Sequence, residues 1–273
     1  MKPLDVKYCF SPSLLDSFQS LLDFEENWER YWGSSDEPSK SLEEYQEECN
    51  QSLLDAINNV PFTSEASSMG KAWNDLIDTL IHKKKCGKTQ ITRKCDETGK
   101  VIAAHCELDG FSFDFDINDA KDAAKYFADC LSQIHVISYI ETKYGIVNLH
   151  GYLDEHRHDV VYDIKTTKSY EFGNYLEKWQ KHVYPYCLLE SGVCTDIKEF
   201  EYTVFQMQGG RSRQPIITAK MYTEVYTYLH DATRRMLKEH CELFIEYIER
   251  NRDKITNDNL FKDYNLRKYK NKV

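Results

Sequence analysis

The chain has 273 residues, of which 41% are hydrophobic, and a formal net charge of -10. This length and composition suffice for one large core with helical additions. The acidity excludes a protein that coats nucleic acid through bulk positive charge, although local basic patches can still bind it. We find neither a charged-then-apolar leader nor an apolar run approaching the roughly 18 residues of a membrane span, so we expect a soluble, cytoplasmic protein without a membrane partner.

The first 60 residues are predicted to form an N-terminal helical segment. Ser11 can cap a first helix and Pro12 suits its first turn, ahead of a face of leucines. Residues 34–40 have the composition of a linker. A second, acidic helix is expected from residue 41 to about residue 58, with its glutamates on a solvated face.

A basic stretch ends the third expected helix, which runs from residue 69 to about residue 84. It contains Lys83, Lys84 and Lys85 and leads toward a hairpin turn at residues 95–100. Lysines placed in this way could follow a DNA backbone. More often such a run is a solvated helix end, and DNA contact is the less favoured of the two interpretations.

Alternating residues predict the next elements. Residues 111–116 alternate as a strand whose aromatic rings could stack on bases, but a place in the core is the better interpretation. A helix is expected over residues 119–130. Strands at 134–141 and 146–153 then form a hairpin through a glycine-containing turn.

The C-terminal third contains two more expected strands, at residues 198–208 and 215–220, followed by a long helix over residues 221–250. Arg211 and Arg213 lie in the loop between these strands. They are candidates for contact with phosphate groups.

The centre of the chain is a strand at residues 160–167, which is β-branched or aromatic at most positions. Asp163 and Lys165 are two apart, so their side chains share one face. The preceding strand ends at Asp154, and the polar residues 155–159 are predicted to form the turn. If this turn centres on its last two residues, Asp154 lies opposite Asp163, on strands roughly 5 Å apart.

Two facing carboxylates repel each other unless a cation lies between them, and oxygen ligands select a hard ion such as Mg²⁺ or Mn²⁺. A metal beside an ammonium group suits phosphodiester hydrolysis, because both stabilise negative charge on the phosphorus centre. A bare Asp-x-Lys is usually a surface pair at a strand end. The apolar strand around this pair, and Asp154 in front of it, favour the catalytic interpretation.

Other metal ligands were considered. Nine cysteines are scattered without close pairing, and we expect reduced thiols. Three of them could bind zinc, although their spacings match no tight pair: Cys86, Cys95 and Cys106. Three histidines lie near the central strands, and for those in the turn we expect solvated side chains rather than a metal site: His150, His156 and His158.

The spacing Gly151-x-x-Asp154, then Asp163-Ile164-Lys165, then Gln180-x-x-x-Tyr184 resembles the RecB-like branch of the PD-(D/E)XK nuclease superfamily. In that family the two acids bind metal, the lysine is catalytic, and the Gln-x-x-x-Tyr helix packs beside the site. Taken alone, that helix could equally be an ordinary amphipathic one. The resemblance implies these catalytic residues: Asp154, Asp163, Lys165, Gln180 and Tyr184. It implies these metal ligands: Asp154, Asp163, Ile164, Asp78 and Asn74.

Gly70, Asn74 and Asp78 lie on one face of the third expected helix. The family has Gly-x-x-x-His-x-x-x-Glu there, so Asn74 is a departure that offers an amide oxygen in place of an imidazole. Packing of small residues explains Gly70 and Asn74 equally well, whereas Asp78 points to the site. Because only Cys241 follows Cys194, the late cysteine group of some relatives is absent, and we expect no iron–sulfur cluster.

These observations predict an α/β fold with a PD-(D/E)XK restriction-endonuclease-like core and a mixed central sheet flanked by helices. We expect the core to span residues 61–251 and a basic tail to follow at 252–273. The resemblance implies a stand-alone Mg²⁺- or Mn²⁺-dependent deoxyribonuclease of phage or recombination systems, an exonuclease rather than an endonuclease. Its partners would be DNA and a separate recombination or single-strand-binding protein. The alternative is a catalytically impaired nucleic-acid-binding or assembly subunit of the same fold, which Asn74 and the acidity favour.

Overall fold

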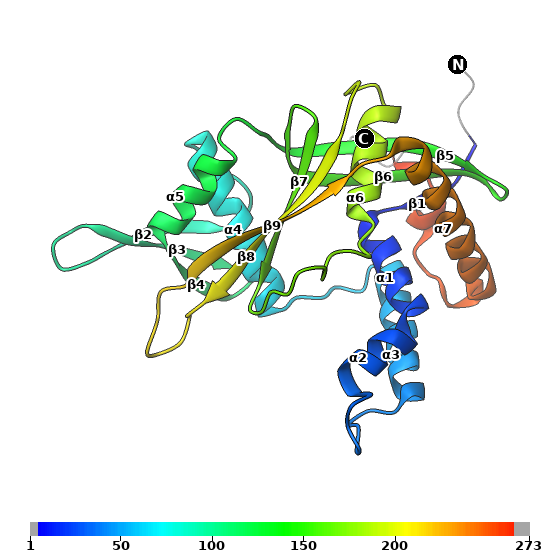
Figure 1. Cartoon of the computed structure of the whole chain (residues 1–273), viewed down its shortest axis with the longest axis horizontal. Coiled ribbons are helices and arrows are strands. Elements are labelled where there is room, and N and C mark those ends of the chain that lie inside the picture. Colours follow the sequence, from blue (N-terminus) through cyan, green and yellow to red (C-terminus); the bar gives the residue numbers. More distant parts are fainter. Residues whose placement is uncertain (1–4, 265–273) are drawn as a thin grey trace.

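The computed structural model describes residues 5–264 and shows an α/β fold with a mixed central sheet flanked by helices (Figure 1). The elements are, in chain order, β1 (Val6–Phe10), α1 (Pro12–Leu22), α2 (Phe24–Trp32), α3 (Leu42–Ile57), α4 (Glu65–His82), β2 (Gln90–Cys95), β3 (Val101–Leu108), β4 (Phe111–Asp116), α5 (Ile117–Tyr126), β5 (Leu131–Thr142), β6 (Gly145–Arg157), β7 (Val160–Thr167), α6 (Gln180–Glu190), β8 (Glu199–Gln208), β9 (Thr218–Thr227), α7 (His230–Arg250), and the short 3-10 helices η1 (Arg252–Lys254) and η2 (Asp258–Phe261).

The central sheet has the order β1-β6-β7-β8-β9, and β5 pairs with β6 as well. The β1–β6 and β7–β8 pairs are parallel and the others are antiparallel. The long strand β6 pairs with β1 as far as Leu149 and with β7 only from Glu155 onward. Strands β6 and β7 therefore separate at the level of Asp154 and Asp163, one position past the last pair.

The two faces of the sheet contact different helices. Helices α1, α6 and α7 pack on one face, in a core cluster that includes Val161. Helices α4 and α5 pack on the other face, in a cluster that includes Tyr162 and Ile164. Because side chains alternate along a strand, Asp163 and Lys165 share the face of Val161. The small sheet β2-β3-β4 joins the larger one through Ile217. The Ile217 carbonyl accepts a hydrogen bond of 2.8 Å from the backbone N–H of Asp116, and the Ile217 N–H donates one of 2.7 Å to the carbonyl of Asp114.

Serine caps explain where several helices begin. Ser11 accepts a hydrogen bond from Leu14 at the start of α1, as predicted. Ser41 forms a capping box with Glu44 at the start of α3, which was not predicted. The third helix, expected from residue 69, begins earlier, because Ser64 caps α4. The strand β1 and the helix α2 were not predicted.

The turn before the central strand is shorter than predicted. Strand β6 continues to Arg157, and only residues 158 and 159 form the turn, with His158 in the left-handed region at φ 55°. Glu155 and His156 are buried strand residues, so the expected solvated turn at their positions was wrong. The reason is pairing: Glu155 lies opposite Tyr162, and both face the core beneath α4 and α5.

The C-terminal part also differs from the prediction. The last helix begins at His230, whereas residues 221–227 continue strand β9, where tyrosine, threonine and valine side chains suit a sheet. The described part of the expected basic tail includes Leu260, which is buried in the core. The remainder, residues 265–273, lies outside the described residues. Within residues 5–264 no helix is long and apolar enough to cross a membrane.

Candidate functional site

Asp154, Asp163 and Lys165 meet where β6 and β7 separate. The Lys165 Nζ atom lies 2.6 Å from Asp163 Oδ2. The Asp154 Oδ2 atom accepts a hydrogen bond of 2.8 Å from the backbone N–H of Ile164. Continuing the β6–β7 register places Asp154 beside Asp163, as the position of the turn predicted.

Helix α6 adds Gln180 to this group. Lys165 Nζ donates a hydrogen bond of 2.7 Å to Gln180 Oε1. We call the four residues Asp154, Asp163, Lys165 and Gln180 the candidate site. Gln180 is the first residue of α6, so the lysine of the central strand contacts the beginning of a helix 15 residues later in the chain.

Tyr184 lies one turn further along α6 and packs against Gly151. A Cβ atom on Gly151 would lie 2.7 Å from Tyr184 Cε1 and 3.3 Å from Pro12 Cδ. The first distance is shorter than carbon atoms tolerate, so only glycine fits there without a shift of its neighbours. The Gly151 and Tyr184 positions of the sequence pattern are therefore in direct contact.

Burial and mutual repulsion govern the charges of the candidate site. Asp163 is 2% exposed. Burial, followed by the charge of Asp163, raises the pKa of Asp154 to about 7. Burial also raises the pKa of Asp163, against the influence of Lys165. For Lys165, burial lowers the pKa, but the Asp163 carboxylate and then Asp154 outweigh it, so the pKa is raised and the side chain is an ammonium.

Asp16 of α1 is a neighbour of the candidate site that the sequence did not reveal. Its Oδ1 atom accepts a hydrogen bond of 2.6 Å from the backbone N–H of Trp179, immediately before Gln180. Burial raises the pKa of Asp16, and Lys165 is among the charges that oppose the shift. Asp16 therefore helps to place the start of α6.

Helix α4 brings Asp78 to Glu155. Asp78 is 5% exposed and interacts with Glu155 and Gln133, while Glu155 is fully buried. Burial, followed by the charge of Asp78, raises the pKa of Glu155 to about 9. Gln133 also donates a hydrogen bond of 3.4 Å to Asp154 Oδ1 and so links the two acidic groups. The sequence missed Glu155 because it was assigned to a polar turn.

Gly70 and Asn74 lie earlier on α4. A Cβ atom on Gly70 would lie 2.9 Å from Thr166 Oγ1, which shows how closely this helix approaches β7. The Asn74 Oδ1 atom is buried without a hydrogen-bond partner within residues 5–264. The structure thus places Asn74 and Asp78 beneath the sheet, on the side opposite Asp163 and Lys165.

The described residues contain no group of three or more His, Cys, Asp or Glu side chains arranged to hold a metal ion. The predicted ligands are therefore only partly brought together. Asp154, Asp163 and the backbone of Ile164 lie side by side, whereas Asp78 contacts Glu155. All nine cysteines lie in the described part of the chain and are free thiols.

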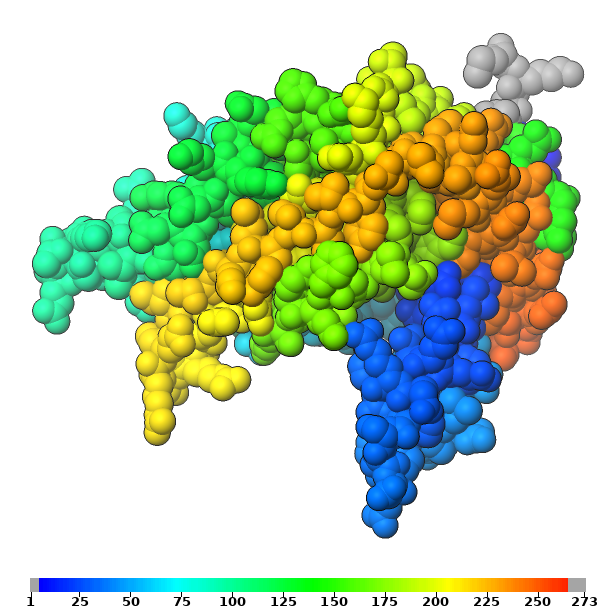
Figure 2. Space-filling model, viewed as in Figure 1, coloured from blue at the N-terminus to red at the C-terminus, as the bar shows by residue number. Residues whose placement is uncertain are grey.

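The predicted DNA-binding residues form two separate exposed groups. Lys83 ends α4 in the left-handed region at φ 52°, and with Lys84 and Lys85 it borders a cavity of about 740 Å³ between α4 and the small sheet. Arg211 and Arg213 lie in the exposed loop between β8 and β9. In Figure 2 this loop (yellow) and the helices α2 and α3 (blue) project on either side of a hollow.

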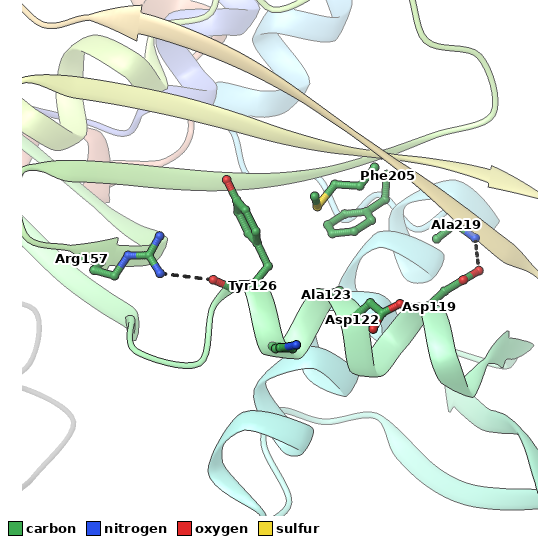
Figure 3. A pocket seen from close by; sticks show the side chains of 9 residues that line it. Asp119, Asp122, Ala123, Tyr126, Arg157, Phe205 and Ala219 are labelled. Atoms are coloured by element: carbon green, nitrogen blue, oxygen red, sulfur yellow. Dashed lines mark hydrogen bonds between the residues drawn. The ribbon is translucent and has the colours of Figure 1, made fainter.

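A second cavity, of about 550 Å³, lies between α5 and strands β8 and β9 (Figure 3). At its edges Arg157 donates a hydrogen bond of 3.3 Å to the carbonyl of Tyr126, and Asp119 accepts one of 2.8 Å from the backbone N–H of Ala219. Phe205 forms part of its wall and belongs to the core on the side away from Asp163. Among the described residues that line it, none is a predicted catalytic residue, so this cavity is not the candidate site.

Comparisons with known proteins give little for either fold or function. No family model and no curated protein matches the chain. One solved structure, described as "Crystal structure of SSO0001", is similar at 12% identity with a TM-score of 0.29. The similarity covers 45% of this chain and 54% of that chain, so the chain spans about half of its length. A likeness this slight carries no weight for fold or activity.

Proposed function

We propose that the chain is a metal-dependent nuclease with a PD-(D/E)XK core of the RecB-like type, which hydrolyses phosphodiester bonds in DNA. One observation carries the proposal: Asp154, Asp163, Lys165 and Gln180, which come from three elements, meet where β6 and β7 separate. In an ordinary surface Asp-Lys pair at a strand end, the aspartate is exposed and no glutamine from another element bonds to the lysine. Here Asp163 is buried and Gln180 bonds to Lys165.

The residues of the candidate site are suited to a hard cation. Asp163 Oδ2 has no hydrogen-bond partner within residues 5–264 apart from its ion pair with Lys165. Burial, followed by repulsion from Asp163, raises the pKa of Asp154. A cation between the two carboxylates would relieve this repulsion, and Asp154 and Asp163 would hold it. Mg²⁺ or Mn²⁺, when bound, activates a water and neutralises charge on the phosphate.

Lys165 supplies the remaining positive charge. Its pKa is raised, so it keeps its proton at Nζ at neutral pH and can stabilise charge that develops on the phosphate oxygens. Gln180 accepts a hydrogen bond from the same nitrogen and fixes its direction. Asp16 holds the backbone just before Gln180 and so acts through its position.

Hydrolysis of linear duplex, circular duplex and single-stranded DNA with Mg²⁺ or Mn²⁺ tests the proposal. We expect hydrolysis to require the metal and to be lost in Asp154→Asn, Asp163→Asn and Lys165→Ala, with unchanged circular dichroism. Lys238→Ala, which changes an exposed lysine of α7, is the matched control and should keep full activity. Full turnover in a folded Lys165→Ala variant would refute the assignment. Degradation of linear but not circular DNA would identify an exonuclease.

A catalytically impaired DNA-binding or assembly subunit is the second candidate. Asn74 at the histidine position of the family, and the lack of a three-residue metal group among residues 5–264, favour it. DNA binding without metal-dependent hydrolysis in the same assays would establish this alternative.

A further inference from the structure

The segment that joins Lys165 to Gln180 lies against the candidate site. We call residues 168–179 the connecting segment. Within it Tyr175 stacks on Tyr202 with ring centroids 5.1 Å apart, and the Tyr202 ring lies 5.7 Å from Lys165 Nζ. Residues at the middle of the connecting segment are thus two ring contacts away from the lysine of the site.

Phe172 is held in place on both sides, yet its ring points into solvent. The backbone N–H of Gly173 donates a hydrogen bond of 3.0 Å to Glu224, a buried residue of β9. On the other side, Arg30 of α2 contacts Glu171 at 3.2 Å. Phe172 itself is 79% exposed.

A further aromatic pair lies beside Phe172. Tyr170 packs on Tyr222 with ring centroids 4.6 Å apart, and Lys220 Nζ lies 4.9 Å from the Tyr222 ring centre. Lys168, at the start of the connecting segment, is exposed. Single exposed apolar residues are ordinary on protein surfaces. Phe172 differs in that both of its sequence neighbours contact other elements and that it lies near aromatic and cationic groups, in the segment that leads from Lys165 to Gln180.

The distance to the candidate site suits a nucleic-acid strand. Three peptide units separate Phe172 from Tyr175, so their Cα atoms lie at most about 11 Å apart. The contacts from Tyr175 to Tyr202 and from Tyr202 to Lys165 add 5.1 and 5.7 Å, so Phe172 lies within about 22 Å of Lys165. Stacked nucleotides advance about 3.4 Å each along a strand, so about six or seven nucleotides cover this distance. A base about that far along the strand from the reacting phosphate can therefore reach the Phe172 ring.

We infer that Phe172 is a stacking platform for an unpaired base, and that the substrate class is single-stranded DNA or a single-stranded end. This inference rests on the proposed nuclease function. Aromatic rings stack on any base, whereas bases inside a duplex are already covered by their neighbours on both faces. The exposed side chains of Lys168 and Lys220 supply positive charge for the phosphate backbone of the DNA strand.

Fluorescence anisotropy of the full chain in EDTA tests the platform without hydrolysis. The probes are a fluorescein-labelled oligodeoxythymidylate of about twelve nucleotides and its blunt duplex with oligodeoxyadenylate. We expect Phe172→Ala to weaken single-strand binding by about fivefold to 150-fold, the effect of losing one stacked base, and to leave duplex binding unchanged. Phe172→Trp should retain the affinity, whereas Phe172→Leu, which is apolar but has no π face, should lose it.

Phe62→Ala is the matched control, because Phe62 is 80% exposed in the loop before α4. It should bind as the unaltered chain does. Unchanged affinity in Phe172→Ala, full affinity in Phe172→Leu, equal loss in Phe62→Ala, or no single-strand binding at all would overturn the platform. Metal-dependent hydrolysis could still be present in each of these cases. Single-strand binding that depends on Phe172, without any hydrolysis, would instead refute the proposed nuclease function and support the stacking role of Phe172.

Discussion

The Lys165 ammonium donates to the Gln180 side-chain oxygen across 2.7 Å, which ties strand β7 to the first turn of α6. The same nitrogen lies 2.6 Å from Asp163, so one donor group serves an anionic and a neutral acceptor. Glutamine adds no charge, and it therefore directs Lys165 without altering the electrostatic balance of the two aspartates. This relationship gives Gln180 a positioning role in the proposed reaction.

Replacing Gln180 by leucine should lower kcat by about tenfold to 150-fold, the effect of losing a hydrogen bond to a charged group. KM should change little, because Gln180 acts through Lys165. Gln180→Glu keeps an acceptor and should retain more activity than Gln180→Leu. Steady-state kinetics, with circular dichroism to check the fold, measures the effect. Equal activity in the leucine variant and the unaltered chain would show that Gln180 only packs.

Gly151→Ala should lower the free energy of unfolding by about 1–3 kcal/mol, because the added methyl overlaps the Tyr184 ring. In a Tyr184→Leu background the same change should cost less, since the ring atom it meets is gone. Urea unfolding of the four proteins measures this coupling. Additive losses would mean that the two residues do not meet in solution.

The stability of the metal-free protein should fall as the pH rises from about 5 to about 9. Glu155 has its pKa raised from 4.5 to about 9, chiefly by burial and then by Asp78, so the folded state holds a proton that the unfolded chain has released. The contribution is complete below pH 4.5 and is lost as the pH approaches 9, on the order of 1 kcal/mol for each pH unit. Asp154 acts in the same direction up to about pH 7.

Glu155→Gln tests this pH dependence, because the amide cannot ionise and can still accept the hydrogen bond from Ser132. Urea midpoints measured in EDTA at several pH values should decline less steeply in this variant. Glu199→Gln, at an exposed position of β8, is the control and should follow the unaltered chain. A slope unchanged by Glu155→Gln would show that another group binds the proton.

Local sequence was sufficient to predict the pairing of Asp154 with Asp163. A strand has a period of two, so once the turn is placed at residues 158 and 159 the register follows, and the structure has that register. The family pattern implied that the helix with Tyr184 packs beside the site, but it did not predict the contact of Tyr184 with Gly151. No period links these two residues, because the irregular connecting segment lies between their elements.

The features that local sequence did not predict depend on packing between elements that are far apart in the chain. Glu155 was assigned to a turn because charged residues are usually exposed, but here it is buried beneath Asp78 of a helix more than 70 residues earlier. Residues 221–227 were assigned to a helix because the strong helical period after His230 was extended too far upstream. Asp16 approaches the candidate site only because α1 packs beside the start of α6.

Arg211 and Arg213 should carry more of the DNA backbone contact than Lys83 and Lys84. Thr167, at the end of β7, pairs with Gln206, so the loop with both arginines extends from the same end of the sheet as the connecting segment. Lys83, by contrast, lies 13 residues along α4 from Gly70, which contacts Thr166, and thus about 20 Å away along the helix.

In binding to single-stranded oligodeoxythymidylate, removing both arginines should reduce the slope of log K against log salt by about 1.4, two contacts at 0.7 each. The Lys83→Ala/Lys84→Ala variant removes the same charge and should leave the slope unchanged. Equal reductions in the two variants would mean that net charge, rather than position, governs binding.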